Sequence, residues 1–178
     1  MAWATRFGRV SFLALDWRKA FDSINTESML FALRRFGLPE DFVLMVSSIY
    51  ERRSFQVRDC GHTSSQRVQR SGIVQGCPLS PFLFIIVMSV IMHDAHAKLS
   101  KEAKLAVTEG RLADLLYADD TLLIGSNTKY VGELAAAVEE IGKRHGMSLH
   151  WGQTQAMSIG SNEHFRVLAA THCQNRSP

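Results

Sequence analysis

Short apolar runs alternate along the chain with segments whose apolar residues recur at helical spacing. The runs at 10–15, 115–117 and 121–124 are of strand length and almost wholly apolar, which is typical of buried strands. Polar and apolar residues alternate over 54–69, which predicts an exposed hairpin turning at Gly61-His62. These patterns indicate an antiparallel sheet with a hairpin outside it.

Helical spacing of apolar residues, with start and stop signals, predicts four helices. Asn25 is expected to cap the first helix and Gly37 to end it, and Ser80 is expected to cap the third before Pro81 opens it. The four helices are expected over 26–36, from Pro39 onward, over 81–99 and over 128–145. A final hairpin is expected between 148–151 and 155–159. Helices packed on an antiparallel sheet make an α+β domain.

Composition restricts the class of protein. The chain has 178 residues, enough for one domain with a substantial core. A net charge of +3 permits a nucleic-acid partner without requiring one. The apolar run 82–92 is about half of what a membrane span needs, so we expect a core helix and no membrane association. Cys60, Cys77 and Cys173 are odd in number and widely spaced, which favours a reducing, intracellular location.

The most informative segment is LLYADDTLLIG, which places Asp119 and Asp120 between two apolar runs. Two carboxylates about 4 Å apart repel by about 4 kcal/mol at an effective dielectric of about 20. A cation relieves that repulsion, and oxygen ligands of this kind suit Mg²⁺. The alternative is a plain acidic turn, because Asp is a common turn residue.

A third carboxylate, Asp16, ends the first apolar run. If that strand pairs beside the Asp119-Asp120 hairpin, the three carboxylates meet at one edge of the sheet. Three carboxylates can hold two divalent ions, and such a site stabilises the attacking and leaving oxygens of phosphoryl transfer.

Four segments resemble the motifs of reverse transcriptases, in the family's order across residues 8–160. FLALDWRKAFDSI resembles motif A, RSGIVQGCPLSPFLFIIVMSVIM motif B, LLYADDTLLIG motif C and GMSLHWGQTQAMSIG motif D. The forms of motifs A and B are most similar to those of non-LTR retrotransposons and group II introns. The resemblance implies an α+β polymerase palm with an antiparallel sheet packed on helices, acting as an RNA-directed DNA polymerase.

The resemblance also implies the site. Asp16, Asp119 and Asp120 match the catalytic metal ligands, which implies two Mg²⁺ ions, with Mn²⁺ as a substitute. The implied partners are an RNA template, a DNA primer and a dNTP. Arg18 and Lys19 flank the site, either to meet phosphates or as a solvated pair.

Three further residues match nucleotide-binding positions. Phe21 matches the aromatic ring that excludes a 2′-hydroxyl, although a core role is the alternative. Gln75 and Gly76 match the motif B pair beside the incoming nucleotide, with a simple loop glycine as the alternative for Gly76. Tyr117 matches the aromatic residue near the primer end, or else is a half-buried strand residue. Asp22 is expected to cap a helix and is given no metal role.

Two departures from the family pattern bear on activity. Gln153 stands where motif D commonly has a lysine, and His150 where it commonly has an asparagine. Residues 1–160 are interpreted as a palm, and residues 161–178 as a polar tail. In the family, fingers precede motif A and a thumb follows motif D, so we expect a longer parent chain to supply both. The alternative function is an inactive retroelement-derived remnant with at most weak RNA binding. An RNA-dependent RNA polymerase is disfavoured by the Tyr-x-Asp-Asp form and by Phe21.

Overall fold

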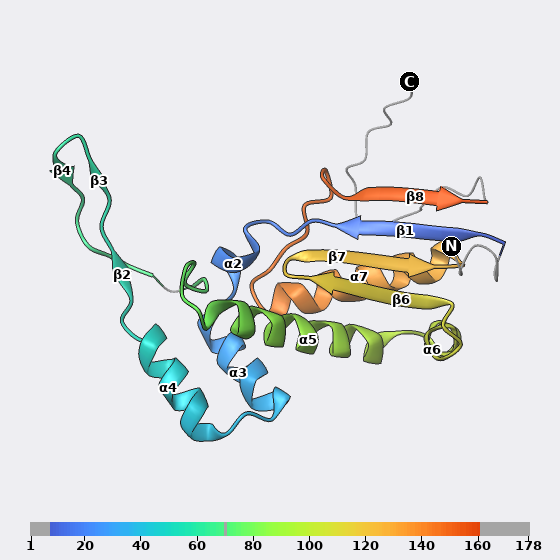
Figure 1. The fold of residues 1–178 in the computed structure, drawn as a ribbon, viewed down its shortest axis with the longest axis horizontal. Helices are drawn as coiled ribbons and strands as arrows, with labels where there is room; N and C mark the ends of the chain where they lie inside the picture. The colour runs from blue at the N-terminus through green and yellow to red at the C-terminus, as the bar shows by residue number, and fades with distance from the viewer. Residues whose placement is uncertain (1–7, 70, 161–178) are drawn as a thin grey trace.

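A four-stranded antiparallel sheet forms the centre of the computed structural model, which describes residues 8–69 and 71–160. The strand order is β6-β7-β1-β8, so β1 lies between the β6-β7 hairpin and β8 (Figure 1). The strands are β1 (Val10–Leu15), β6 (Leu112–Tyr117), β7 (Asp120–Gly125) and β8 (Gln155–Ile159). The mixture of helices and antiparallel sheet confirms the predicted α+β class.

Helices cover one face of this sheet. α7 contacts both β7 and β1, and α5 packs against α7 and α3. Burial alternates along the strands, so that Leu13 and Leu123 are buried beneath the helices while Ala14 and Leu115 face outward. The helices are α2 (Ala20–Ser23), α3 (Thr26–Phe36), α4 (Glu40–Tyr50), α5 (Ser80–Lys98), α6 (Lys101–Thr108) and α7 (Thr128–Arg144).

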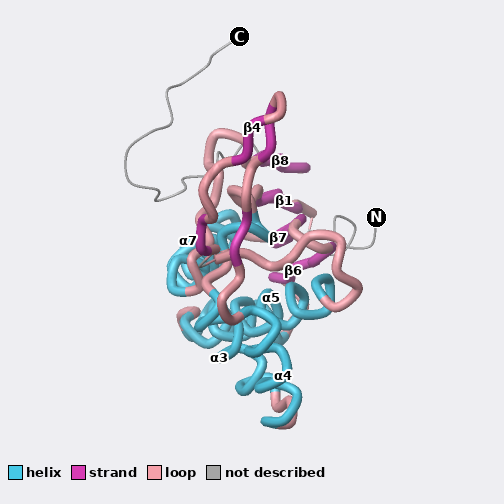
Figure 2. The backbone as a smooth tube through the Cα atoms, turned by 90° about the vertical axis from the view of Figure 1, so that its left-hand side faces the viewer, coloured by secondary structure: helices cyan, strands magenta, loops and turns pink. Residues whose placement is uncertain are grey.

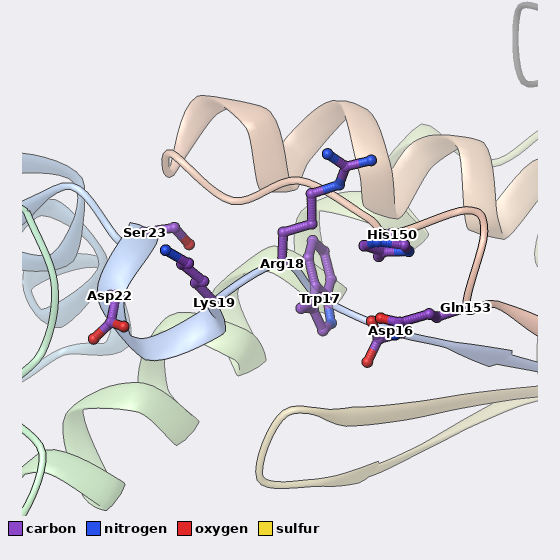
Figure 3. Close-up of a pocket in the computed structure, with 8 residues that line it drawn as sticks. All are labelled: Asp16, Trp17, Arg18, Lys19, Asp22, Ser23, His150 and Gln153. Carbon is purple, nitrogen blue, oxygen red and sulfur yellow. The ribbon is translucent and has the colours of Figure 1, made fainter.

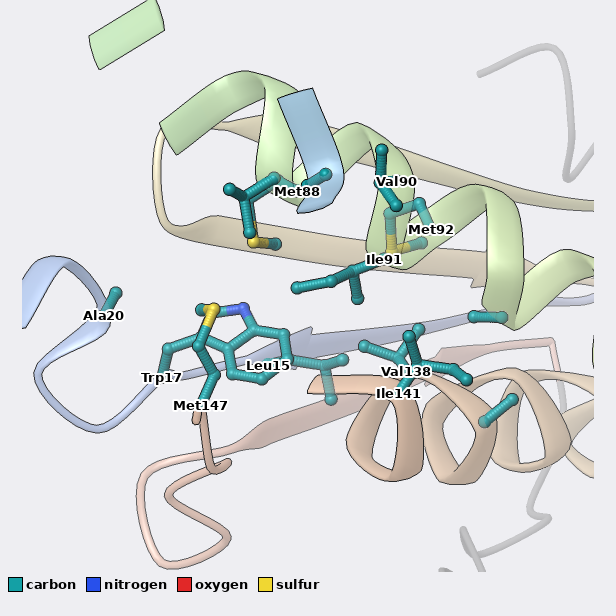
Figure 4. Packing of buried hydrophobic residues seen from close by; sticks show 14 of the residues in the cluster. Leu15, Trp17, Ala20, Met88, Val90, Ile91, Met92, Val138, Ile141 and Met147 are labelled. Atoms are coloured by element: carbon teal, nitrogen blue, oxygen red, sulfur yellow. The ribbon is translucent and has the colours of Figure 1, made fainter. Parts of the chain in front are cut away.

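The core lies between the sheet and helices α5 and α7. Figure 4 shows Met88 and Ile91 of α5 and Ile141 of α7 converging on Leu15 and Trp17 at the end of β1. All five side chains are buried. The carboxylate that follows Leu15 therefore starts from a fixed, well-packed position.

Local signals explain the boundaries of α3. The Asn25 side chain accepts hydrogen bonds from the backbone N–H groups of Glu27 and Ser28, at 2.8 and 3.3 Å. Gly37 ends the helix in the left-handed region, with φ of 94°. Both predicted end signals of this helix are confirmed.

The predicted cap of α5 is wrong. Leu79 occupies the N-cap position, and the Ser80 hydroxyl donates to the carbonyl of Val74. Ser80 therefore ties the start of α5 to the preceding loop. By length and composition α5 could span a membrane, but half of the relevant window is buried inside the described structure, as the prediction of a core helix requires.

Residues 54–68 form an exposed β-ribbon, called the arm below, that projects from the body beyond α4 (Figures 1 and 2). Two short ladders build it, one between β2 (Ser54–Phe55) and β5 (Arg67–Val68) and one between β3 (Arg58–Asp59) and β4 (His62–Thr63). The turn is Cys60-Gly61, one residue earlier than predicted, because Asp59 pairs with His62. Both turn residues have positive φ, 45° and 82°, which matches the twist of a two-residue hairpin.

The C-terminal part of the domain differs from expectation. The predicted hairpin between 148–151 and 155–159 does not form, because β8 pairs with β1 instead. Residues 148–154 form a loop that lies beside the end of β1, through an isolated bridge between Trp17 and Leu149. The predicted tail, 161–178, lies outside the described residues.

Candidate active site

The three predicted carboxylates gather at one end of the sheet. The last pair of the β1-β7 ladder is Leu15 with Thr121, so Asp16 and Asp120 occupy the next position on the two strands. In the β6-β7 hairpin, Tyr117 pairs with Asp120, which leaves Ala118-Asp119 as the two-residue turn. The predicted meeting of the Asp16 strand with the hairpin is confirmed.

The hairpin turn carries backbone strain. Ala118 has a φ of 52°, in the left-handed region that costs an alanine about 1 kcal/mol or more. Asp119 and Asp120 are exposed, whereas Asp16 is half-buried. Asp120 belongs to the first position of β7, so only Asp119 lies in the turn itself.

Trp17 fixes the relative positions of the strands around this end. Its indole Nε1 donates to Thr121 Oγ1 of β7 at 3.1 Å, in a buried hydrogen bond. A Cβ on Gly142 of α7 would lie only 2.7 Å from the Trp17 ring, so the ring packs directly on the helix backbone. No local pattern in the sequence indicates this role, because each contact comes from a distant segment.

The loop after α7 lies against Asp16 and its neighbours. The backbone N–H of His150 donates to the carbonyl of Asp16 at 2.8 Å, and the N–H of Arg18 donates to the carbonyl of Ser148 at 2.9 Å. The N–H of Gln153 in turn donates to the His150 carbonyl at 2.8 Å. The two residues that depart from the family's motif D are thereby held at the same end of the sheet as Asp16.

An open cavity of about 610 Å³ lies at this junction (Figure 3). His150 Nδ1 is buried without a hydrogen-bond partner among the described residues. In Figure 3 the Arg18 side chain points away from Asp16, while the His150 ring lies on the side of Asp16 nearer α7. The lining residues are Asp16, Trp17, Arg18, Lys19, Asp22, Ser23, His150 and Gln153.

The donor chemistry at this end fits a hard divalent cation. Asp16, Asp119 and Asp120 offer only carboxylate oxygens, the ligands that Mg²⁺ prefers. Within residues 8–69 and 71–160, however, no three His, Cys, Asp or Glu side chains are arranged as a group that could hold a metal ion. Because Mg²⁺ is commonly held by one or two carboxylates together with substrate phosphates, the site fits an ion that arrives with a nucleotide.

A second cavity, of about 460 Å³, brings together the three predicted nucleotide-binding residues, Phe21, Gln75 and Gly76. Phe21 stacks on Phe84 of α5, with ring centroids 4.2 Å apart and planes inclined by 17°. The ring is half-buried, so it packs against the core and also lines the cavity. The core alternative for Phe21 is therefore confirmed in part, and exclusion of a 2′-hydroxyl by the ring stays a prediction.

Backbone contacts dock the motif B loop onto α2. The N–H of Ile73 donates to the carbonyl of Phe21 at 2.6 Å, and the N–H of Gly72 donates to that of Ile24 at 2.8 Å. Gly72 has a φ of 93°, and a Cβ there would lie 3.0 Å from the Asp22 backbone, so glycine is required. The loop can approach motif A this closely only without a side chain at position 72.

Asp22 connects the two cavities. Its Oδ1 accepts a hydrogen bond from Gln75 Nε2 at 3.2 Å, while the residue also lines the larger cavity. The predicted capping role is wrong, because Lys19 occupies the N-cap of α2 and Asp22 lies inside the helix. Tyr117 is 80% exposed, which excludes the half-buried alternative.

The amino-acid sequence of the chain is similar to those of a known protein family. Residues 5–172 match the family described as "Reverse transcriptase (RNA-dependent DNA polymerase)". The chain belongs to the reverse transcriptase family. Members of this family use divalent metal ions, in agreement with the carboxylate donors at the end of the sheet.

The similar curated proteins are encoded by non-LTR retrotransposons. The chain is 34% identical over 61% of its length to the Pol polyprotein of the type-2 retrotransposable element R2DM from Drosophila melanogaster, covering 10% of that protein. It is 28% identical over 84% of its length to the type-1 R2 Pol polyprotein from Popillia japonica, covering 21%. It is 32% identical over 68% of its length to the RNA-directed DNA polymerase of jockey from Drosophila melanogaster, covering 12%. The chain therefore spans about a tenth to a fifth of these relatives.

The fold is also found in solved structures. An apo telomerase from Candida tropicalis superposes with a TM-score of 0.65 at 15% identity, covering 88% of this chain and 32% of the telomerase. At that identity the likeness concerns the fold. It agrees with a polymerase palm, as the sequence motifs predicted.

Proposed function

We propose that this reverse transcriptase domain is the palm of an RNA-directed DNA polymerase, which extends a DNA primer on an RNA template with dNTPs. The observation that carries the proposal is the strand register that puts Asp16 next to Asp120 and beside the Asp119 turn. The names of the relatives support it, since the jockey protein is an RNA-directed DNA polymerase. Because the chain covers a small part of each relative, we propose that fingers and thumb belong to a longer parent chain.

The side chains have separate roles in this proposal. Asp16, Asp119 and Asp120 would hold two Mg²⁺ ions, or Mn²⁺ in their place. When bound, such ions neutralise the phosphates and stabilise the primer 3′-oxygen that attacks the α-phosphorus and the pyrophosphate that leaves. Positioning and charge neutralisation supply most of the catalysis in phosphoryl transfer.

The second cavity would select the nucleotide. The Phe21 ring, supported by Phe84, is rigid enough to oppose a 2′-hydroxyl and so favours dNTP over rNTP. Gly76 leaves room for the base pair, and the Gln75 amide, oriented by Asp22, offers a donor and an acceptor. The free thiols Cys60 and Cys77 support an intracellular location, which we include in the proposal.

Primer extension tests this function. A polymerase chain that contains this palm together with fingers and thumb is incubated with a labelled DNA primer on an RNA template, dNTPs and Mg²⁺. Extension by the chain, lost in Asp119→Ala and kept in the matched surface variant Asp41→Ala, is the expected result. Both aspartates are exposed, so neither change is expected to disturb the core.

The second candidate function is the inactive remnant with at most weak RNA binding. Gln153 favours it, because an amide cannot supply the charge of the lysine common in motif D. The same assay separates the two functions. No extension by the unaltered chain, or extension that survives Asp119→Ala, contradicts the polymerase proposal.

A further inference from the structure

The motif B loop, residues 72–76, lies between two parts of the chain. On one side its backbone N–H groups bond to the carbonyls of motif A, as described above. On the other side two side chains at the end of α4, Tyr50 and Arg53, bond to its backbone. The loop is therefore held between motif A and α4, and the second set of contacts comes from outside the sequence motifs.

Tyr50 fixes the residue that directly precedes Gln75. Its side chain is 5% exposed, and its hydroxyl accepts a hydrogen bond from the N–H of Val74 at 3.3 Å. The carbonyl of Val74 accepts from the hydroxyl of Ser80, at the start of α5. Both polar groups of the Val74 backbone are thus bound by side chains, which sets the direction in which the chain continues into Gln75.

Arg53 binds both the tyrosine ring and the loop. Its guanidinium lies 4.7 Å from the centre of the Tyr50 ring, a distance at which a cation is attracted to the face of an aromatic ring. Its Nη1 donates to the carbonyl of Gly72 at 2.9 Å. Gly72 is the residue whose backbone approaches Asp22 so closely that only glycine fits. Arg53 therefore holds the loop at the point of its closest contact with motif A.

These contacts act on the second cavity from outside it. Neither Tyr50 nor Arg53 is among the described residues that line that cavity, whereas Gln75 is. The Gln75 amide is oriented at its far end by Asp22, 3.2 Å away, and its backbone is placed by Val74. Because a small displacement of a group that positions a substrate has a large effect, a loop held at both ends keeps this amide in one place.

We propose that Tyr50 and Arg53 are positioning residues for the incoming nucleotide. They hold the motif B loop against motif A, so that the Gln75 amide meets the nucleotide in a fixed orientation. The identity of the ligand, a dNTP, rests on the proposed function, whereas the support of the loop requires no catalysis. Since neither side chain reaches the reacting atoms, their loss weakens nucleotide binding and leaves the chemical step largely intact.

Hydrogen exchange tests the support of the loop without requiring activity. Exchange of the Val74 amide is measured by mass spectrometry of overlapping peptides, in a polymerase chain that contains this palm together with fingers and thumb. Tyr50→Phe removes the acceptor of this N–H and keeps the ring, so exchange should be about fivefold faster, as for the loss of one ordinary hydrogen bond. Tyr130→Phe removes a hydroxyl from a half-buried tyrosine on α7 and should leave it unchanged. Unchanged exchange within α7 in both variants shows that the effect is local.

Single-turnover extension tests the effect on the nucleotide. Tyr50→Phe should raise the apparent Kd for dNTP about fivefold and change the maximal rate less than about twofold, because it loosens a group that binds and leaves the reacting groups in place. Arg53→Met, which keeps an apolar side chain without a donor, should act in the same way. Arg53→Lys keeps a cation near the ring and should recover part of the loss. Tyr130→Phe should change neither quantity.

A double variant shows whether Tyr50 acts through Gln75. Gln75→Ala is expected to raise the apparent Kd for dNTP, and adding Tyr50→Phe to it should raise the Kd less than about twofold further. Two residues that act through one contact give such non-additive effects, whereas independent effects add. A general loss of stability in Tyr50→Phe would not depend on the side chain at position 75.

The outcomes separate this inference from the proposed function. Unchanged exchange of the Val74 amide in Tyr50→Phe, or additive effects with Gln75→Ala, would overturn the inference even if the chain extends primers. A lower maximal rate with an unchanged Kd would overturn it as well. Faster exchange confined to the loop, in a chain that extends no primer, supports the inference and contradicts the polymerase proposal. If Tyr50→Phe fails to fold, Arg53→Met decides by the same measurements, because Arg53 is only half-buried.

Discussion

Two side chains beside Asp16 set this chain apart from the usual motif D. The loop that carries His150 and Gln153 is bonded to the backbone of Asp16, so both residues line the cavity at the candidate site. Neither residue provides the permanent positive charge of a lysine. In the proposed reaction, charge that develops on the departing phosphate oxygens would meet a neutral amide at position 153.

Restoring the lysine should accelerate the chemistry. In a polymerase that contains this palm, Gln153→Lys is expected to raise the single-turnover rate of nucleotide addition by about tenfold or more, because a positioned acid or cation contributes at least that much. Rapid-quench measurement of the first addition gives the rate. Gln153→Met is the control, and equal rates in the two variants would show that position 153 does not act on the leaving group.

At the level of single residues, the sequence indicated the site because its chemistry lies in contiguous motifs. Asp16, Asp119 and Asp120 do gather at one end of the sheet, and Phe21, Gln75 and Gly76 do line one cavity. The role of Asp22 was predicted wrongly because its hydrogen-bond partner, Gln75, lies in another motif.

Among the elements, α3 and α5 are joined by a bidentate ion pair. Arg35 donates to both carboxylate oxygens of Asp94, with Nη2 to Oδ1 at 2.7 Å. This hydrogen bonding holds the pKa of Asp94 below its ordinary value. Burial of the carboxylate raises the pKa, but by less than the hydrogen bonding lowers it. The positive charges of Arg35, His93 and His145 also lower the pKa. The pair fixes α3, and with it the segment that leads to the arm, to the central helix.

The lowered pKa makes part of the stability dependent on pH. Because the folded-state pKa of Asp94 lies below that of the unfolded chain, the contribution is complete above the unfolded pKa, about 3.9, and is lost as the pH falls through the folded value. Asp94→Asn should cost about 1 kcal/mol at pH 7 and less at pH 3, since the pair is partly exposed.

Urea unfolding at pH 7, 5 and 3 measures this difference. Asp41→Asn, an equal change of charge at an exposed position on α4, is the control and should show no such convergence with the unaltered chain. A cost for Asp94→Asn that is the same at pH 7 and pH 3 would contradict the assignment to the ionised pair.

Elements with local signals were predictable, and those defined by distant partners were not. The strand at 10–15 and the helix at 26–36 formed as expected because apolar spacing and capping residues are local properties. The predicted final hairpin does not form because β8 pairs with β1, at the other end of the chain. Pairing between strands that are neighbours in sequence is common but not obligatory. The short helices α2 and α6 were not predicted at all.

At the scale of the molecule, the sheet face opposite α5 and α7 is apolar and uncovered among the described residues. Leu115 and Tyr117 of β6 and Met157 and Ile159 of β8 are about half exposed or more. An exposed apolar face of this kind marks an interaction surface. The chain spans only 10–21% of the relatives described above, which contain much additional sequence.

The isolated chain should therefore bind an environment-sensitive hydrophobic dye while folded. Leu115→Asn/Met157→Gln is expected to lower the dye fluorescence by about half, because it removes two of the most exposed apolar side chains of the face. Leu105→Asn on α6, an exposed leucine away from the sheet, should change it little. Equal fluorescence from all three proteins would contradict a contiguous face, and near-ultraviolet circular dichroism checks that each is folded.

The contact between Trp17 and Gly142 has a consequence for how this sequence can diverge. The two positions share one volume, since a methyl group at 142 would overlap the indole ring. An alanine at 142 becomes acceptable once a smaller side chain occupies 17, but that change also removes the donor that bonds Thr121. Substitutions at 17, 121 and 142 are thus coupled, and the order in which they arise decides whether the intermediate sequence still folds.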